Sequence, residues 1–271
     1  MSGSAPTVAL PDENVFGHRK KLEFLRRRVM EYVNRRPDRR IRLLDIGCSN
    51  GQLVTIHLGD LGVDIVAIDP HEPSIEYARA HNPYPHIITF QKATIEDLSP
   101  DERFDIIVMA DVLEHLENPG DLLREARRRL DEGGLILASI PNGYGPFEIE
   151  NALDKRGCLA PSYWIFRMLS RLKPIFSGGK RAIYNLAETP YAFECGHVQF
   201  WTLNRFKKLA EKCGMRIVER RNGPWMGALC TSTWWGRSRR FCAWNARIGD
   251  LLPSFMVSTW YFVIEKCELA K

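Results

Sequence analysis

Short apolar segments recur along the first half of the chain, separated by amphipathic stretches. Segments of this length that are mostly apolar are typical of strands buried on both faces of a sheet, whereas apolar residues spaced by three and four predict helices. The pattern predicts strands at 41–46, 63–68, 87–90, 104–109 and 135–140, and helices at 51–59, from Pro73 to the break at Asn82, and from Pro119, which Asn118 is expected to cap. Strands that alternate with helices form βαβ units, so we expect a parallel sheet covered on both faces.

The first 36 residues are predicted to form an arm and a basic helix in front of this region. Residues 1–17 are mostly small or polar, whereas from His18 to Arg36 apolar residues recur at helical spacing until Pro37. Eleven lysines and arginines fall between residues 19 and 42. Such a charge density attracts an anionic substrate, an anionic membrane surface or nucleic acid, although a solvated helix face has the same composition.

The alternating pattern stops near residue 143. Residues 144–197 contain longer loops and one amphipathic segment at 164–172, which we interpret as an insertion that forms a lid or a substrate pocket. Aromatic and basic residues share this segment, so contact with a membrane surface is the alternative. Beyond it, Thr202 is the expected N-cap of a helix at 203–213.

Two more strands, at 215–221 and 258–266, complete the predicted sheet. The tryptophan-rich stretch between them, 222–257, either lines an acceptor pocket or fills a core. The expected fold is α/β, with a doubly wound, Rossmann-like sheet of seven mostly parallel strands, an N-terminal helix, and insertions after strands five and six. We expect one domain over 37–271, preceded by the arm and helix of 1–36.

Composition adds few constraints. Of the 271 residues, 45% are hydrophobic and 26% charged, as in ordinary globular proteins. The seven cysteines form no CxxC pair, which predicts reduced thiols, and Cys195 with His197 is too small a ligand set for a metal site, so none is expected. The N-terminus lacks the pattern of a secretory signal, and no run reaches the roughly 18–20 apolar residues of a membrane span. We expect a cytoplasmic protein, at most peripheral at the membrane.

The first predicted strand ends in a glycine-rich turn from Gly47 to Gly51. Two glycines let the backbone pass close to a ligand and aim helix N-terminal amides at it. The carboxylate of Asp45 would repel a pyrophosphate and hold a cationic ligand. Some twenty residues later Asp69 ends the second strand, where an acid commonly accepts both hydroxyls of a ribose. A nicotinamide-dependent dehydrogenase shares these features, but its turn reads GxGxxG, whereas this one reads GxxxG.

Further short motifs follow this turn in a fixed order. They are Leu43-Asp45-Gly47-Cys48-Gly51, Asp69, Phe104-Asp105, Val112-Leu113-Glu114-His115, Gly133-Gly134, Pro141-Asn142, and Gly196-His197-Val198 with Phe200-Trp201-Thr202. The set resembles the class I S-adenosylmethionine-dependent methyltransferases related to the ubiquinone-biosynthesis O-methyltransferases. The resemblance covers about residues 40–221.

The resemblance implies a cofactor, S-adenosylmethionine, and a set of residues that contact it. In those families the loop after the third strand contacts adenine through an acid, whose place Thr94 takes here, and through a backbone amide, here that of Ile95. His115 and His197 would face the acceptor, and we favour His115 as general base because it follows the switch point at the fourth strand. The implied cofactor contacts are Asp45, Gly47, Cys48, Ser49, Gly51, Gln52, Asp69, Pro70, Thr94, Ile95, Ala110 and Asp111.

The expected reaction is O-methylation of a small molecule, either a sugar or lipid-linked saccharide, which would be anionic and partly apolar, or another secondary metabolite. N- or C-methylation of a metabolite, a nucleic-acid methyltransferase and a non-enzymatic binding protein are the alternatives. A nucleic-acid partner is not expected, because Met109-Ala110-Asp111-Val112 ends the fourth strand in place of an Asn/Asp-Pro-Pro-aromatic motif and no RNA-binding module signature is present.

Overall fold

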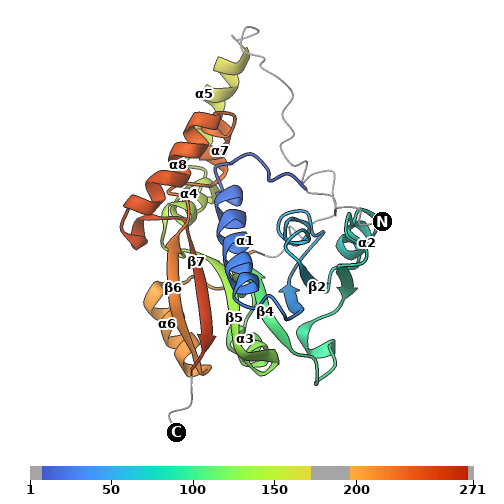
Figure 1. The fold of residues 1–271 in the computed structure, drawn as a ribbon. Helices are drawn as coiled ribbons and strands as arrows, with labels where there is room; N and C mark the ends of the chain where they lie inside the picture. Colours follow the sequence, from blue (N-terminus) through green and yellow to red (C-terminus); the bar gives the residue numbers. More distant parts are fainter. Residues whose placement is uncertain (1–7, 172–195, 268–271) are drawn as a thin grey trace.

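One sheet organises the computed structural model, which describes residues 8–171 and 196–267 (Figure 1). Its strand order is β3-β2-β1-β4-β5-β7-β6; β1 to β5 are parallel, and β7 is antiparallel to both of its neighbours. This confirms the predicted mostly parallel seven-stranded sheet. The strands are β1 (Ile41–Ile46), β2 (Val63–Asp69), β3 (Ile88–Lys92), β4 (Phe104–Ala110), β5 (Leu130–Pro141), β6 (Met215–Asn222) and β7 (Thr259–Lys266).

Helices cover both faces of the sheet. On one face α1 (His18–Asn34) and α2 (Glu72–Ala80) share a hydrophobic cluster with β1 and β2. On the other face α3 (Pro119–Arg129) and α6 (Leu203–Lys212) pack against β4, β5 and β7. The central strands are therefore buried from both sides, which explains why they are apolar almost throughout.

Four further helices lie together at the end of the sheet where β5 ends and β7 begins (Figure 1). They are α4 (Pro146–Lys155), α5 (Ala160–Arg171), α7 (Leu229–Trp235) and α8 (Arg239–Leu251). The predicted amphipathic segment at 164–172 lies mostly in α5, and the rest of that insertion, from 172 to 195, lies outside the described residues. No helix in the described ranges is long and apolar enough to span a bilayer.

Three local predictions were wrong. The predicted helix at 51–59 is a series of turns and a 3₁₀ helix, Thr55–Leu58, because the Thr55 hydroxyl donates to the Asp45 carboxylate at 2.7 Å and holds the segment against β1. At the start of α3, the Asn118 side chain makes no capping hydrogen bond. Finally, the strand predicted at 135–140 is longer, because β5 begins at Leu130, and its pairing with β4 shifts register between Phe104 and Ile106.

The tryptophans of the second insertion pack against neighbouring aromatic rings. The rings of Trp225 and Trp244 lie 5.6 Å apart, and that of Trp235 lies 5.4 Å from Phe241. Trp234 meets Phe166 of α5 at 5.3 Å, so it joins the two insertions. None of the four tryptophans lines the cavity beside Asp111 described below, and none is buried, since Trp235 and Trp244 are 53% and 45% exposed, so their rings pack against neighbouring rings near the surface.

Removal of one buried ring should show how strongly α6 depends on the sheet. Phe206 is fully buried between Trp201 and Phe262, so Phe206→Ala should lower the free energy of unfolding by about 3–5 kcal/mol. Phe255→Ala is the control, because that ring is 70% exposed and its loss should change stability by less than about 0.5 kcal/mol. Urea denaturation measures both, and equal effects of the two substitutions would contradict the packing described.

Candidate active site

The glycine turn after β1 is fixed to the end of β2. The amides of Gly47 and Cys48 both donate to the carbonyl of Ile68, at 2.9 and 3.1 Å. Gly47 and Gly51 have φ of 70° and 73°, which glycine adopts without strain. A Cβ on Gly47 would lie 2.7 Å from Val112, so neither the backbone angle nor the available space tolerates a side chain there. Within the same turn, Cys48 is buried and the Gln52 amide donates to Asn50 at 3.2 Å.

Asp69, at the end of β2, holds the turn from the other side. One of its carboxylate oxygens accepts the Ser49 amide at 2.9 Å, and the other accepts the His71 amide at 2.8 Å. Each oxygen keeps a further lone pair, so the carboxylate can still accept ribose hydroxyls. Pro70 follows directly and is exposed. The structure therefore brings the predicted ribose acid beside the predicted cofactor turn.

Asp45 lies beneath this turn and is buried. Burial raises the pKa of its carboxyl group to about 7, although the hydrogen bond from Thr55 opposes the shift. A buried carboxylate without a full positive partner is costly. A cationic group bound nearby would favour its charged form.

Asp111 lies directly after Ala110, the last residue of β4, and has a backbone angle that is unusual for a residue with a side chain. Its φ is 57°, in the left-handed region. The Ser139 hydroxyl of β5 donates to its carboxylate at 2.5 Å, and Lys21 of α1 forms an ion pair with it. Burial alone would raise the pKa of Asp111, but the Lys21 ammonium outweighs that effect and holds it below its usual value.

The loop after β3, expected at the adenine, is closed by a local hydrogen-bond pair. The Thr94 amide and hydroxyl both donate to the carboxylate of Asp97, at 2.8 and 2.9 Å. Because the Ile95 side chain is buried, a ligand beside this loop could contact Ile95 only through its backbone. Thr94 is therefore committed to Asp97 through its side chain.

A cavity of about 480 Å³ opens beside Asp111, where β4 and β5 end. Both predicted histidines, His115 and His197, line it. Its wall includes aromatic side chains of both insertion and sheet, Phe147, Phe200 and Tyr261, with Lys155 among its polar groups. Ligands of open α/β sheets bind at this edge, beyond the carboxyl ends of the strands.

The two histidines lie edge to face, with 5.1 Å between ring centroids. Nδ1 of His197 lies 2.6 Å from a carboxylate oxygen of Glu148 in α4. A carboxylate at one ring nitrogen fixes the tautomer and leaves the other nitrogen, Nε2, to accept a proton. Sequence reasoning missed Glu148, because only its position on a helix of the insertion brings it to His197.

Glu114 is the second residue that sequence reasoning did not assign to the site. Its side chain is 1% exposed, and no described residue hydrogen-bonds to either carboxylate oxygen. Burial, followed by the nearby charge of Asp111, raises its pKa well above the usual value. The Glu114 carbonyl accepts the amides of Val198 and Gln199, at 2.9 and 3.0 Å, and so holds the two histidine-bearing segments together.

Glu114, His115 and His197 also form a group that can hold a divalent cation. One ligand atom from each lies within 4.8 Å of the other two. Two imidazoles and one carboxylate are common ligands of zinc and related metals. The other residue considered at sequence level, Cys195, lies outside the described residues.

Comparisons with known proteins identify the family to which this chain belongs. The model of a methyltransferase domain family matches residues 17–220. A ubiquinone biosynthesis O-methyltransferase from Bradyrhizobium diazoefficiens is 35% identical over 103 residues, 38% of this chain and 40% of the relative. One from Rickettsia bellii is 26% identical over 186 residues, 62% of this chain and 75% of the relative. This chain therefore spans about 40% of the length of the Bradyrhizobium relative.

Two solved structures share the fold. A magnesium protoporphyrin IX methyltransferase from Synechocystis PCC 6803 with bound S-adenosylhomocysteine has a TM-score of 0.51 at 12% identity, over 92% of this chain and 84% of its own. A plantazolicin methyltransferase in complex with S-adenosylhomocysteine has a TM-score of 0.52 at 16% identity, over the same shares. The family match extends over most of the chain, and the protein belongs to the class I S-adenosylmethionine-dependent methyltransferases.

Proposed function

We propose that this protein transfers a methyl group from S-adenosylmethionine to a hydroxyl oxygen of a small molecule. The observation that carries the proposal is the Glu148–His197 pair in the cavity beside Asp111. A histidine fixed by a carboxylate is suited to take the proton of a hydroxyl group at neutral pH. The relatives named ubiquinone biosynthesis O-methyltransferase support oxygen as the acceptor atom.

In this proposal, residues at the ends of β1, β2 and β4 would hold the cofactor. The turn from Gly47 to Gly51 and Asp45 would hold its methionine part and ammonium. Asp69 would accept its ribose hydroxyls, and the backbone of Ile95 would contact its adenine. Asp111 and Ala110 would border its sulfonium end. The backbone angles of the turn and the burial of Asp45 support these assignments.

The reaction depends mainly on alignment of the acceptor oxygen with the methyl group. The acceptor oxygen attacks the methyl carbon, the bond between that carbon and sulfur breaks, and S-adenosylhomocysteine leaves with the electron pair on sulfur. Positioning of the two reactants can supply on the order of 7–11 kcal/mol. The proton released by the acceptor passes to Nε2 of His197. The motif position favours His115 for this step, but the Glu148 contact favours His197, with His115 beside it.

A cation held by Glu114, His115 and His197 is the second candidate for activation of the hydroxyl. A divalent ion would lower the pKa of a bound hydroxyl and would favour the charged form of the buried Glu114 carboxyl group. The convergence of their ligand atoms supports this candidate. The two candidates differ in their response to a chelator.

For the acceptor we propose a sugar or a lipid-linked saccharide, or another anionic, partly apolar metabolite. The positive charge of Lys155 supports an anionic acceptor, and the aromatic wall of the cavity supports a partly apolar one. Helix α5 exposes Trp164, Ile165 and Met168 by 44–64% beside Arg167, which supports peripheral contact of a cytoplasmic enzyme with a membrane. N- or C-methylation of a metabolite and a nucleic-acid acceptor stay alternatives.

Two glycine substitutions test the cofactor turn. Gly47→Ala meets Val112 at 2.7 Å and should remove S-adenosylhomocysteine binding. Gly62→Ala is a matched control, because Gly62 has φ of 73° but no atom within 4 Å of its would-be Cβ. The control should keep normal cofactor affinity in isothermal titration. If Gly47→Ala binds the cofactor as Gly62→Ala does, the turn is not the cofactor site.

Cofactor affinity should depend on pH through Asp45. Its pKa of about 7 means that the carboxyl group is largely protonated, and uncharged, below pH 7. The cofactor ammonium requires the carboxylate, so affinity should rise with pH and should increase about tenfold between pH 6 and pH 7.5. Asp45→Asn should bind more weakly and lose this dependence, whereas exposed Asp101→Asn should retain it. A wild-type affinity that is flat over this range would contradict the role of Asp45.

Substitution of the histidines tests the chemistry separately from cofactor binding. His197→Ala should lower turnover by about 10²–10⁴-fold with S-adenosylhomocysteine affinity unchanged, and Glu148→Gln should lower it less. His115→Ala should also lower turnover. Transfer of labelled methyl groups to a panel of sugars, lipid-linked saccharides and hydroxylated metabolites is the assay. Near-normal turnover in both histidine variants would refute the assignment, and loss of wild-type turnover with a chelator, restored by a divalent ion, would favour the cation over a free base.

A further inference from the structure

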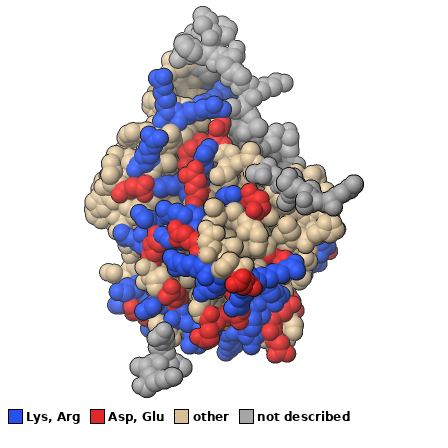
Figure 2. Space-filling view, in the orientation of Figure 1, with Lys and Arg blue, Asp and Glu red and all other residues tan. Residues whose placement is uncertain are grey.

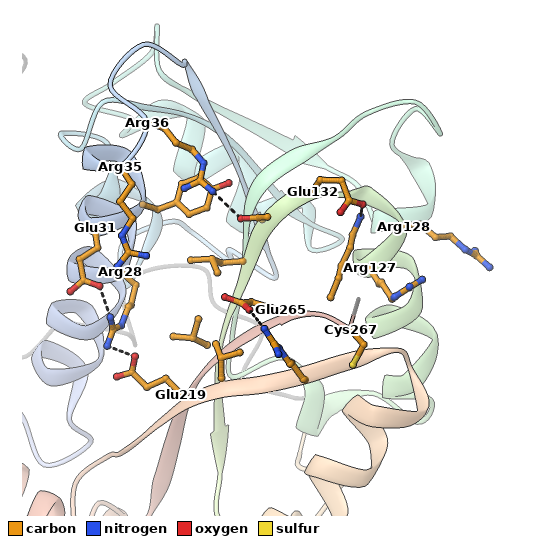
Figure 3. Close-up of a pocket in the computed structure, with 18 residues that line it drawn as sticks. Arg28, Glu31, Arg35, Arg36, Arg127, Arg128, Glu132, Glu219, Glu265 and Cys267 are labelled. Atoms are coloured by element: carbon orange, nitrogen blue, oxygen red, sulfur yellow. Dashed lines mark hydrogen bonds and ion pairs between the residues drawn. The ribbon is translucent and has the colours of Figure 1, made fainter. Parts of the chain in front are cut away.

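A second and larger hollow lies at the opposite end of the sheet strands from the active-site cavity. It measures about 1520 Å³ and shares no lining residue with that cavity. One wall is the second half of α1, the other is the end of α3, and the floor is formed by β5, β6 and β7 (Figure 3). We call it the basal groove. It is larger than the roughly 300–1,000 Å³ that small-molecule sites occupy.

The basal groove carries an excess of positive charge. Seven basic and four acidic side chains line it. Figure 2 shows lysine and arginine side chains gathered over the lower part of the α1 face, with acidic residues between them. The basic residues are Arg28, Arg35, Arg36, Arg127, Arg128, Arg216 and Lys266, and the acidic ones are Glu31, Glu132, Glu219 and Glu265.

The acidic residues of the groove are already in ion pairs. Arg28 contacts both Glu31 and Glu219, Arg216 lies 3.2 Å from Glu265, and Lys266 lies 3.5 Å from Glu132. The excess positive charge of the groove therefore comes from the arginines that are not paired with these glutamates.

Three guanidinium groups have donors to spare. Within the described part of the chain, no carboxylate contacts Arg35, Arg36 or Arg127. Arg36 lies over the ring of Tyr32 at 3.8 Å and donates to the Gly133 carbonyl at 3.3 Å, while Arg127 donates to the Gly214 carbonyl at 3.0 Å. A guanidinium has five N–H donors, so most of them stay available for carboxylates of a bound partner.

The floor between these arginines is apolar. Leu135, Val218 and Val263 form it, and Val218 is 43% exposed. Val218 is the extra residue where β6–β7 pairing shifts register between Ile217 and Glu219. The bulge brings two consecutive residues of β6, one apolar and one acidic, to the groove.

These features discriminate among the anionic partners that could bind here. A bilayer surface is flat and cannot enter a groove between two helices. A nucleic acid presents phosphates but no apolar side chains toward a basic surface, so it would leave the apolar floor of the groove uncovered. A protein segment with more acidic than basic residues and apolar residues between them matches the charges and the floor together.

We propose that the basal groove is a docking site for an acidic, amphipathic segment of a partner protein. Carboxylates of the segment pair with Arg35 and Arg36 on one wall and with Arg127 on the other, where Arg128 adds positive charge although one of its nitrogens already lies 2.9 Å from Glu125. Its apolar side chains cover Val218 and Leu135. The proposal is independent of the methyl acceptor, because the groove lies apart from the active site.

Binding of a fluorescein-labelled peptide that alternates glutamate and leucine tests the proposal by fluorescence anisotropy. The double variant Arg35→Glu/Arg128→Glu, with one exposed arginine from each wall, should bind it at least about tenfold more weakly. The matched control Arg27→Glu/Arg124→Glu makes the same charge change on the same two helices outside the groove and should bind as wild type. S-adenosylhomocysteine affinity should be the same in all three proteins.

Competing occupants are tested in the same assay. Val218→Asp should weaken binding of the glutamate–leucine peptide more than that of a glutamate–serine peptide of equal charge. Single-stranded DNA of the same charge and phosphatidylglycerol vesicles should bind less tightly than the glutamate–leucine peptide. Equal binding by the two double variants would overturn the proposal. So would tighter arginine-dependent binding of DNA or vesicles, or self-association of the chain that displaces the peptide.

Discussion

The ion pair between Lys21 and Asp111 connects the parts of the molecule on which the active site depends. Lys21 is buried in α1, while Asp111 directly follows the central strand β4 and accepts a hydrogen bond from Ser139 of β5. The Lys21 ammonium is buried whereas the Asp111 side chain is 38% exposed, so loss of the Asp111 carboxylate would weaken the compensation of a buried positive charge. The pair therefore fixes the basic helix over the strand ends, and it holds Asp111 in the left-handed backbone that turns the chain toward Glu114 and His115.

Around this pair the candidate site divides into two halves. The proposed cofactor half is built by backbone contacts between consecutive elements, such as the Gly47 and Cys48 amides on Ile68. The proposed acceptor half is assembled across long sequence distances, since His115 follows β4, while Glu148 and His197 lie at either end of the insertion. With such an arrangement, changes in the insertions could alter the acceptor without altering the cofactor. Open α/β sheets commonly carry variable, functional loops at their strand ends.

These two halves also explain what the sequence could predict. Apolar runs and glycine positions are local signals, and they were sufficient for the seven strands, apart from the start of β5, and for the turn after β1. The 3₁₀ segment after the turn was predicted as a helix because its apolar spacing is helical, whereas its course is determined by the Thr55–Asp45 hydrogen bond. The Glu148–His197 contact and the burial of Glu114 depend on tertiary structure that no local pattern reports. The basal groove also escaped prediction, because its arginines come from α1 and the residues after it, from α3 and from β6, which are far apart in the chain.

The central claim is that the turn between β1 and β2 holds S-adenosylmethionine. Isothermal titration of the unmodified protein with S-adenosylmethionine and S-adenosylhomocysteine measures it most directly. Saturable binding of both compounds at a single site per chain, with NAD giving no heat, is the result that the structure predicts. Absence of binding at millimolar concentrations of either compound, or preferential binding of NAD, would contradict the account.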